Sequence, residues 1–399
     1  MSQNGQYPSV RFNIHGIVTV DFVGASDRLV AAYRARLGPT LDAETAGPAD
    51  IVVAFQDQLS PAGLRYVGQN MAAFDDRDFY LLDPVSGAVQ ALIPMDAIGR
   101  RPRIVCRRDV KSVPCLADLI NITLAGKGYA LLHASGFVYD GAGLLIAGWP
   151  KGGKTGALLA FMNHGAEFIG DEWLLLAPDG REMLGLPGAI SLAEWQLAQM
   201  PTLAPELSAG QRLTFKAIHA LTSLHARLDG GRFKRAYVSR LLGKALPSFK
   251  RQLKIYRPPQ EIFAGQLGRM RAPLDKVFWI VSHDAEHIAV EKSDPQSVAA
   301  RMATANEHEQ GPFWCLYQAF AYAFPARRNG FLESFGSLQR ALLSDALTGR
   351  ETFELAHPYG GPLENLFEAL VPYCQPSAAG AVTNTGSQPE WAQTPGQIP

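Results

Sequence analysis

The centre of this chain reads Gly148-Trp149-Pro150-Lys151-Gly152-Gly153-Lys154-Thr155. It matches the phosphate-binding pattern G-x-x-x-x-G-K-[ST] at every constrained position. Glycines let the backbone curl so that several N–H groups point at phosphate oxygens. Lys154 adds a positive charge at the β- and γ-phosphates, and the Thr155 hydroxyl can ligate Mg²⁺. We therefore expect ATP to contact this whole stretch together with Gly156, and Mg²⁺ to be bound beside it.

The residues on either side of the loop indicate a strand before it and a helix after it. Residues 144–147 form an apolar run typical of a buried strand, and residues 157–162 are typical of a helix packed on a sheet. A phosphate loop requires this order of strand, loop and helix. A helix that begins at the loop also directs its positive end at the phosphates. The alternative, a glycine-rich turn that binds nothing, fits this context less well.

The composition is that of an ordinary globular protein. Of its 399 residues, 47% are hydrophobic and 19% are charged, which is enough material for two domains. Lys and Arg (37) balance Asp and Glu (37), so no overall charge favours a nucleic-acid partner. The first residues lack the features of a signal peptide, and no apolar run is long enough to span a bilayer. We expect a cytoplasmic protein with four reduced cysteines.

The strand and helix patterns divide the chain into two domains and a tail. Residues 1–112 are rich in strand patterns, with one helix over 25–37 and a hairpin over 79–93, and predict an α+β domain. Residues 113–374 contain the phosphate loop and predict an α/β domain. The tail, residues 375–399, is rich in Pro, Gly, Ser, Thr and Gln, and we expect it to be disordered.

Within the second domain, several elements can be placed. A helix is expected over 115–124, and a strand over 129–133 that continues through 137–139. The apolar runs 277–281 and 313–324 predict a core strand and a helix.

A basic insertion lies in this domain. Residues 232–257 hold nine Lys and Arg residues and no acidic one. Three interpretations stay open: a solvated insertion, a docking surface for an anionic acceptor, or contact with a membrane surface.

An acidic pair follows the loop at a short distance. Asp171 and Glu172 come after an apolar run and before residues 173–176, so one helix and one strand return them to the loop. A carboxylate at a strand end can hold the Mg²⁺ that bridges the β- and γ-phosphates. A second carboxylate can take the proton of an attacking hydroxyl. The alternative is an acidic surface turn.

His133 is the third candidate for the site. It ends a predicted strand that we expect to lie beside the strand of the loop, which would place its imidazole near the transferred phosphoryl group. The alternative is a hydrogen-bonded core histidine.

Two other polar clusters carry weaker signals. His283 and His287 have the spacing of a helical metal pair, but they follow a strand and read as a polar turn. Residues 306–309 read as a solvated helix start.

Together, residues 133–136, the loop and residues 169–172 resemble the HPr serine kinase/phosphorylase family and its HPr-kinase-like relatives, which include kinases of lasso-peptide gene clusters. Few other families have a histidine, a phosphate loop and a closely following acidic pair in this order. The related phosphoenolpyruvate carboxykinases share the loop and a similar Gly-Asp-Asp segment. The resemblance predicts a P-loop kinase core of the HPr kinase and phosphoenolpyruvate carboxykinase type, with a mixed sheet, behind the N-terminal α+β domain.

The resemblance also implies roles for individual residues. Lys154 and Thr155 would serve the phosphates and Mg²⁺, and Asp171 would act near the transferred phosphoryl group as metal ligand or base, with His133 beside it. A homo-oligomer is implied as well. The sequence departs from the family where Pro150-Lys151 replaces Ser-Gly, where Gly156 replaces Glu, and where Glu172 replaces Asp. The near absence of other signature segments of the family argues against HPr as the acceptor and against phosphorylase activity.

The leading hypothesis is an ATP- and Mg²⁺-dependent phosphotransferase. Its catalytic residues would be Asp171, His133, Lys154 and Glu172, with Thr155 and Asp171 as metal ligands. The acceptor would be a hydroxyl of a peptide serine, a glycan or a small molecule, and the basic insertion favours one that is anionic or close to a membrane. The alternative is a catalytically degenerate nucleotide-binding regulator. A carboxykinase-like enzyme is a weaker third hypothesis, because no oxaloacetate site is recognisable.

Overall fold

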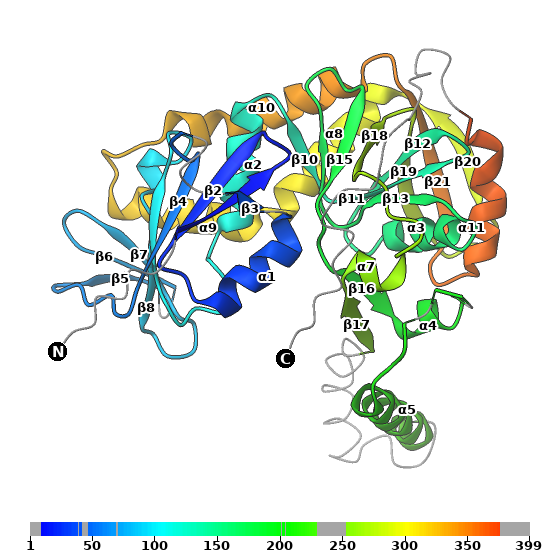
Figure 1. Ribbon diagram of the computed structural model, residues 1–399, viewed down its shortest axis with the longest axis horizontal. Coiled ribbons are helices and arrows are strands. Elements are labelled where there is room, and N and C mark those ends of the chain that lie inside the picture. The colour runs from blue at the N-terminus through cyan, green and yellow to red at the C-terminus, as the bar shows by residue number, and fades with distance from the viewer. Residues whose placement is uncertain are drawn as a thin grey trace.

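The protein is a mixed α/β structure with several mixed and antiparallel sheets (Figure 1). The computed structural model describes residues 9–38, 40–41, 47–68, 71–200, 202–203, 205–229 and 253–375. Most of the basic insertion and nearly all of the predicted disordered tail lie outside these ranges.

The N-terminal half is built on a nine-stranded sheet. Strand β4 is parallel to β2 and β9, and every other pair in this sheet is antiparallel. The predicted hairpin over 79–93 is present as β7 and β8. The strands lie in the order β3 (Thr40–Leu41), β1 (Ser9–Ile14), β2 (Val18–Val23), β4 (Ile51–Gln56), β9 (Arg103–Arg107), β8 (Val89–Leu92), β7 (Phe79–Leu82), β6 (Ala72–Phe74) and β5 (Arg65–Val67).

Helices from distant parts of the chain pack on this sheet. The predicted N-terminal helix is α1 (Asp27–Leu37), and the helix expected over 115–124 is α2 (Leu116–Gly126). The helix α9 (Gly311–Ala323) and the first half of α10 (Gly330–Leu347) complete the same apolar core. This core therefore takes side chains from both sides of residue 112.

The six-stranded mixed sheet carries the phosphate loop. Its strands β12, β19 and β21 are parallel, and the others are antiparallel to their neighbours. The order is β13 (Glu167–Gly170), β11 (Ala134–Tyr139), β12 (Ala142–Gly148), β19 (Lys276–His283), β21 (Glu351–Pro358) and β20 (Ala289–Ser293).

Both faces of this sheet are covered, which explains why β12 is apolar throughout. Leu144 and Ile146 face a core formed with α3 (Lys154–Met162) and α11 (Leu363–Leu370). Leu145 and Ala147 face the opposite core, formed with α8 (Pro295–Glu309). Successive side chains of a strand point to opposite faces, so a strand buried on both sides has no polar positions. The apolar run before the loop is therefore a central strand, as predicted.

Smaller elements border the loop sheet. A four-stranded antiparallel sheet contains β10 (Ala130–Leu132), β14 (Leu174–Leu176), β15 (Glu182–Gly185) and β18 (Arg271–Pro273). A two-stranded ribbon, β16 (Ile190–Ala193) with β17 (Lys254–Arg257), lies near α5 (Ala209–Asp229) in Figure 1. The short helices are α4 (Glu194–Leu197), α7 (Pro259–Ile262), η1 (Met95–Ala97) and η2 (Val371–Tyr373).

One expectation about this region is wrong. The strand predicted over 129–133 does not continue into 137–139, because a bend at His133 interrupts the strand; this bend is called the break at His133 below. Before the break, β10 joins the four-stranded sheet; after it, β11 joins the six-stranded sheet. His133 itself belongs to neither strand. Its backbone is therefore not paired in either sheet, and its side chain can turn toward the end of β13.

A single helix contributes to two cores. Leu332 and Phe335 of α10 belong to the core beneath the N-terminal sheet. Leu343 and Leu347, about two to four turns later, belong to the core between α8 and the loop sheet. The two halves of the protein thus share one rigid element.

The start of β12 leaves no room for a side chain at Gly143. Its N–H donates to an Asp275 carboxylate oxygen at 2.8 Å, and an added Cβ would lie 1.8 Å from the Pro273 carbonyl oxygen. We expect Gly143→Ala to lower the free energy of unfolding by about 3 kcal/mol, because strand β18 must move away. Urea unfolding followed by circular dichroism measures this.

The matched control is Gly188→Ala. An added Cβ at Gly188 would meet no atom of the described chain within 4 Å, and its φ is not positive. This variant should change the unfolding free energy by less than about 0.5 kcal/mol. Equal stabilities for the two variants would contradict the packing described for β12.

Candidate functional site

The phosphate loop joins β12 to α3 and depends on two glycines. Gly148 pairs with Ile280 of β19, and an added Cβ there would lie 2.6 Å from the Ile280 carbonyl oxygen. Gly153 has φ +108°, and its added Cβ would lie 2.5 Å from Nε2 of His357. The backbone therefore approaches its neighbours too closely for any other residue at either position.

The neighbouring parallel strands hold the loop from beneath. His357, on β21, is buried, and its Nε2 lies 2.9 Å from the Gly152 carbonyl oxygen. The Ser282 hydroxyl of β19 donates to the same oxygen at 3.2 Å. The one signal of His357 in the sequence is its place at the carboxyl end of a core strand, where loops of parallel strands meet.

Lys154 is buried at the start of α3. Its ammonium donates to the carbonyl oxygens of Gly148 and Trp149 at 3.0 and 3.1 Å. Burial lowers the pKa of Lys154, and the negative charge of Asp171 opposes this. Because α3 also begins here, the positive end of the helix and the ammonium face the same space, which suits an anionic ligand.

Asp171 is 3% exposed and lies at the end of β13, directly against the loop helix. The Thr155 hydroxyl donates to its carboxylate at 3.1 Å, and the Ser135 hydroxyl of β11 also donates to it. Burial, followed by the negative charge of Glu172, raises the pKa of Asp171 to about 6. The acidic residue predicted beside the loop is thus held there by two hydroxyl groups.

Thr155 and Asp171 fit a Mg²⁺ ion. Mg²⁺ takes oxygen ligands and is usually bound by one or two carboxylates together with substrate phosphates and water. Within the described part of the chain, no group of three His, Cys, Asp or Glu residues could hold a metal by itself. A magnesium ion here would therefore depend on the phosphates of a nucleotide for the rest of its coordination.

His133 lies between two carboxylates. Its Nε2 is 2.9 Å from Glu172 and its Nδ1 is 2.8 Å from Glu309. Ionised carboxylates only accept hydrogen bonds, so both ring nitrogens must donate, which requires the protonated imidazole. The ring also lies against Trp173, with 5.7 Å between ring centroids.

His133, Glu172 and Glu309, called the His133 trio below, stabilise one another in their charged forms. Burial by itself would lower the pKa of His133, but the hydrogen bonds to Glu172 and Glu309 outweigh it and the pKa is raised. In turn, the hydrogen bond from His133 lowers the pKa of Glu172. Glu172 is therefore held as a carboxylate, and its side chain remains 39% exposed.

Glu309 was missed because its segment was misinterpreted. Residues 306–309 are the C-terminal end of α8 and not a solvated helix start. Asn306 is buried and donates to the Leu131 carbonyl oxygen at 2.8 Å, which fixes the helix end against β10. A charged helix end has the same sequence pattern whether it faces water or a partner 176 residues away.

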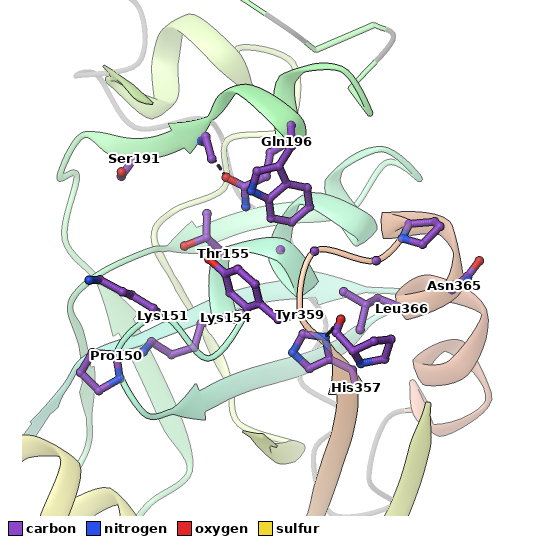
Figure 2. A pocket seen from close by; sticks show the side chains of 18 of the residues that line it. Pro150, Lys151, Lys154, Thr155, Ser191, Gln196, His357, Tyr359, Asn365 and Leu366 are labelled. Carbon is purple, nitrogen blue, oxygen red and sulfur yellow. Dashed lines mark hydrogen bonds between the residues drawn. The ribbon is translucent and has the colours of Figure 1, made fainter. Parts of the chain in front are cut away.

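A cavity runs along the loop (Figure 2). The end of the cavity beside the loop, called the phosphate end below, is lined by His133, Glu172 and the loop from Pro150 to Gly156, apart from Gly152. Gly148 and Asp171 lie beneath its surface, and the indole of Trp149 instead stacks on His308, with 4.6 Å between ring centroids.

The far end of the cavity lies beyond Gly156, between α4 and the turn that leads into α11. Trp195 and Tyr359 line this end, with ring centroids 6.4 Å apart, and Asn365 of α11 adds a polar group. The cavity is thus charged at one end and aromatic at the other.

Other sequence features fall outside this arrangement. Residues 230–252, which include most of the basic insertion, are not among the described residues, but Lys254 on β17 lines the cavity. His283 is the last residue of β19 and His287 lies in the turn before β20, with ring centroids 5.2 Å apart. The four cysteines form no disulfide bonds. In the part of the chain that is described, none of the helices has the length and hydrophobicity needed to cross a bilayer.

No family model matches this chain, and no curated protein matches it at a significant level. The resemblance noted above therefore depends on the quoted residues alone.

The His133 trio gives a prediction about pH. A raised pKa means that the trio stabilises the fold fully below the unfolded-state value of about 6.5 and that this contribution is lost as pH rises through the folded value. We expect Glu309→Gln to lower the pKa of His133 and to cost stability at pH 6 but little at pH 9. NMR titration of the ring and urea unfolding at both pH values measure this.

Glu364→Gln is the control, because Glu364 pairs with His164 at 3.0 Å on the surface. It should leave the His133 titration unchanged. An unshifted His133 in the Glu309→Gln protein would show that Glu309 does not hold the imidazole.

Asp171 gives a prediction of opposite sign. Its folded pKa of about 6 exceeds the ordinary value of 3.8, so the fold loses stability as pH rises between these values and does not regain it above them. We expect Asp171→Asn to raise the unfolding free energy by about 2 kcal/mol at pH 8 and not at pH 4. Denaturant titrations at the two pH values test this.

The exposed Asp140, in the turn before β12, provides the comparison. Asp140→Asn should leave stability unchanged at both pH values. A loss of stability at pH 8 in the Asp171→Asn protein would refute the burial cost inferred for this carboxylate.

Proposed function

We propose that the protein is an ATP- and Mg²⁺-dependent phosphotransferase that moves the γ-phosphate of ATP to a hydroxyl acceptor. One observation carries this proposal. Lys154 and the Thr155–Asp171 pair adjoin the same cavity end as the Glu172–His133 pair. Phosphoryl transfer requires groups that bind the phosphates and a group that accepts the proton of the attacking hydroxyl.

The loop would position the triphosphate. Its N–H groups, the start of α3 and Lys154 together neutralise the β- and γ-phosphates, and most of the catalysis in such reactions comes from positioning and electrostatics. When bound, Mg²⁺ would supply further positive charge at the β- and γ-oxygens, with Thr155 and Asp171 as its protein ligands. Asp171 would have to be ionised for this role.

Glu172 suits the proton-accepting role better than Asp171. It faces the cavity, whereas Asp171 is buried beneath it. The acceptor oxygen would attack the γ-phosphorus, the bond to the β-bridging oxygen would break, and the acceptor proton would pass to Glu172 while ADP leaves. His133 would orient the Glu172 carboxylate, and Glu309 would orient His133.

The arrangement of the sheet agrees with a P-loop kinase core of the HPr kinase and phosphoenolpyruvate carboxykinase type. A mixed sheet carries the loop, and the acidic pair returns beside it after one helix and one strand. The acceptor would be a hydroxyl of a peptide serine, a glycan or a small molecule. Lys254 at the rim of the phosphate end, close enough to lower the pKa of Glu172, favours an anionic acceptor.

The first experiment is incubation of the full-length protein with γ-labelled ATP and Mg²⁺, with and without an extract of its source cells. Label in a discrete product supports the phosphotransferase. Nucleotide binding without transfer to any component, water included, would favour the alternative of a nucleotide-binding regulator.

Lys154→Ala tests the loop directly. We expect label transfer to fall at least about a hundredfold, because a preorganised charge at the phosphates is lost. The protein should remain folded by circular dichroism, since Lys154 is buried at a cost. Lys216→Ala, at an exposed position on α5, should transfer label normally. Unchanged turnover in the Lys154→Ala protein would refute the proposed function.

A further inference from the structure

Lys151 has a backbone conformation that a lysine rarely adopts. Its φ is +65°, in the left-handed region that favours glycine. Seven non-glycine residues of the described chain have a positive φ, and two of them, Lys151 and Glu172, line the cavity of the proposed site. Strained backbone of this kind is found most often where function requires it.

The ammonium of Lys151 is available for a ligand. Lys154 donates to two loop carbonyl oxygens, but no described residue forms a hydrogen bond or ion pair with the Lys151 side chain. The side chain is exposed and belongs to the cavity lining. A cation that is not paired within the protein is free to pair with an anion in the cavity.

Its position matches the end of a triphosphate. Lys151 lies three residues before Lys154 in the loop, and Figure 2 shows both side chains pointing to the same side of the cavity. This side is the phosphate end, which His133 and Glu172 also line. In loops of this pattern the conserved lysine reaches the β- and γ-phosphates. A second lysine at the same end would meet the terminal phosphate.

We propose that Lys151 is a second phosphate-contacting lysine that recognises the γ-phosphate and distinguishes a nucleoside triphosphate from a diphosphate. This inference rests on the nucleotide site of the proposed function. A lysine suits the role because its ammonium is a compact point charge on a flexible stem, which can follow the γ-phosphate as it moves. Lys151 occupies this left-handed position, where a glycine would be less strained.

The test is calorimetric titration with Mg²⁺ and either ADP or a non-hydrolysable ATP analogue. We expect the wild-type protein to bind the analogue at least about tenfold more tightly than ADP. Lys151→Gly and Lys151→Ala should each reduce this ratio to about twofold or less and leave the affinity for ADP unchanged, because only the γ-phosphate contact is lost. Lys151→Arg should keep most of the ratio, since it keeps the charge.

The pair of neutral variants separates the charge from the backbone. Glycine removes both the ammonium and the left-handed strain, whereas alanine removes only the ammonium. We expect the melting temperature of Lys151→Gly to be at or above that of the wild type and a few degrees above that of Lys151→Ala. Such a result would show that the left-handed backbone at Lys151 lowers the stability of the folded protein.

The outcomes distinguish this inference from the proposed function. An unchanged preference for the analogue in Lys151→Gly would overturn the role of Lys151 and leave the phosphotransferase standing. A lost preference, in a protein whose wild type transfers no label, would support Lys151 as the γ-phosphate contact of a nucleotide-binding regulator. A wild type that binds neither nucleotide would overturn both.

Discussion

The burial of the Asp171 carboxylate is the constraint on which the site depends. A buried charge is stable only when hydrogen bonds replace the water it has lost. Here the replacements are the hydroxyls of Ser135 and Thr155, from β11 and α3. Three elements, β13, β11 and α3, must therefore keep their relative positions. The pairing of β11 with both β13 and β12 provides this, because the two outer strands then end at the same sheet edge and bring the acidic residue to the side of the loop.

The break at His133 extends the site beyond the loop sheet. The histidine stands between two sheets and contacts Glu309, at the end of α8. That helix covers the face of the loop sheet opposite α3. Glu172, His133 and Glu309 thus connect the strand end beside the loop to α8, which Trp149 of the loop also contacts through His308. Charges in the site and packing of the C-terminal helices depend on each other.

Local sequence patterns predicted much of the fold, but they could not predict contacts between residues that are far apart in the sequence. The loop could be recognised because its chemistry needs a fixed spacing, and Asp171 because it follows a short strand at the same sheet edge. Glu309 and His357 lie far along the chain from their partners His133 and Gly152, and nothing in their own segments indicates those partners. The break at His133 was hidden because apolar residues continue on both sides of it. Domain limits were equally obscure, since α2, α9 and α10 pack on strands that precede them.

The sharing of α10 by two cores has a consequence for synthesis. The nine strands of the N-terminal sheet are complete by Arg107, but α9 and α10, which cover their apolar face, end only at Leu347. At ordinary ribosomal rates, roughly ten to fifty seconds separate the two events. During this interval the apolar face of the nascent sheet lacks the cover of α9 and α10, so a chaperone that shields this face would favour correct folding.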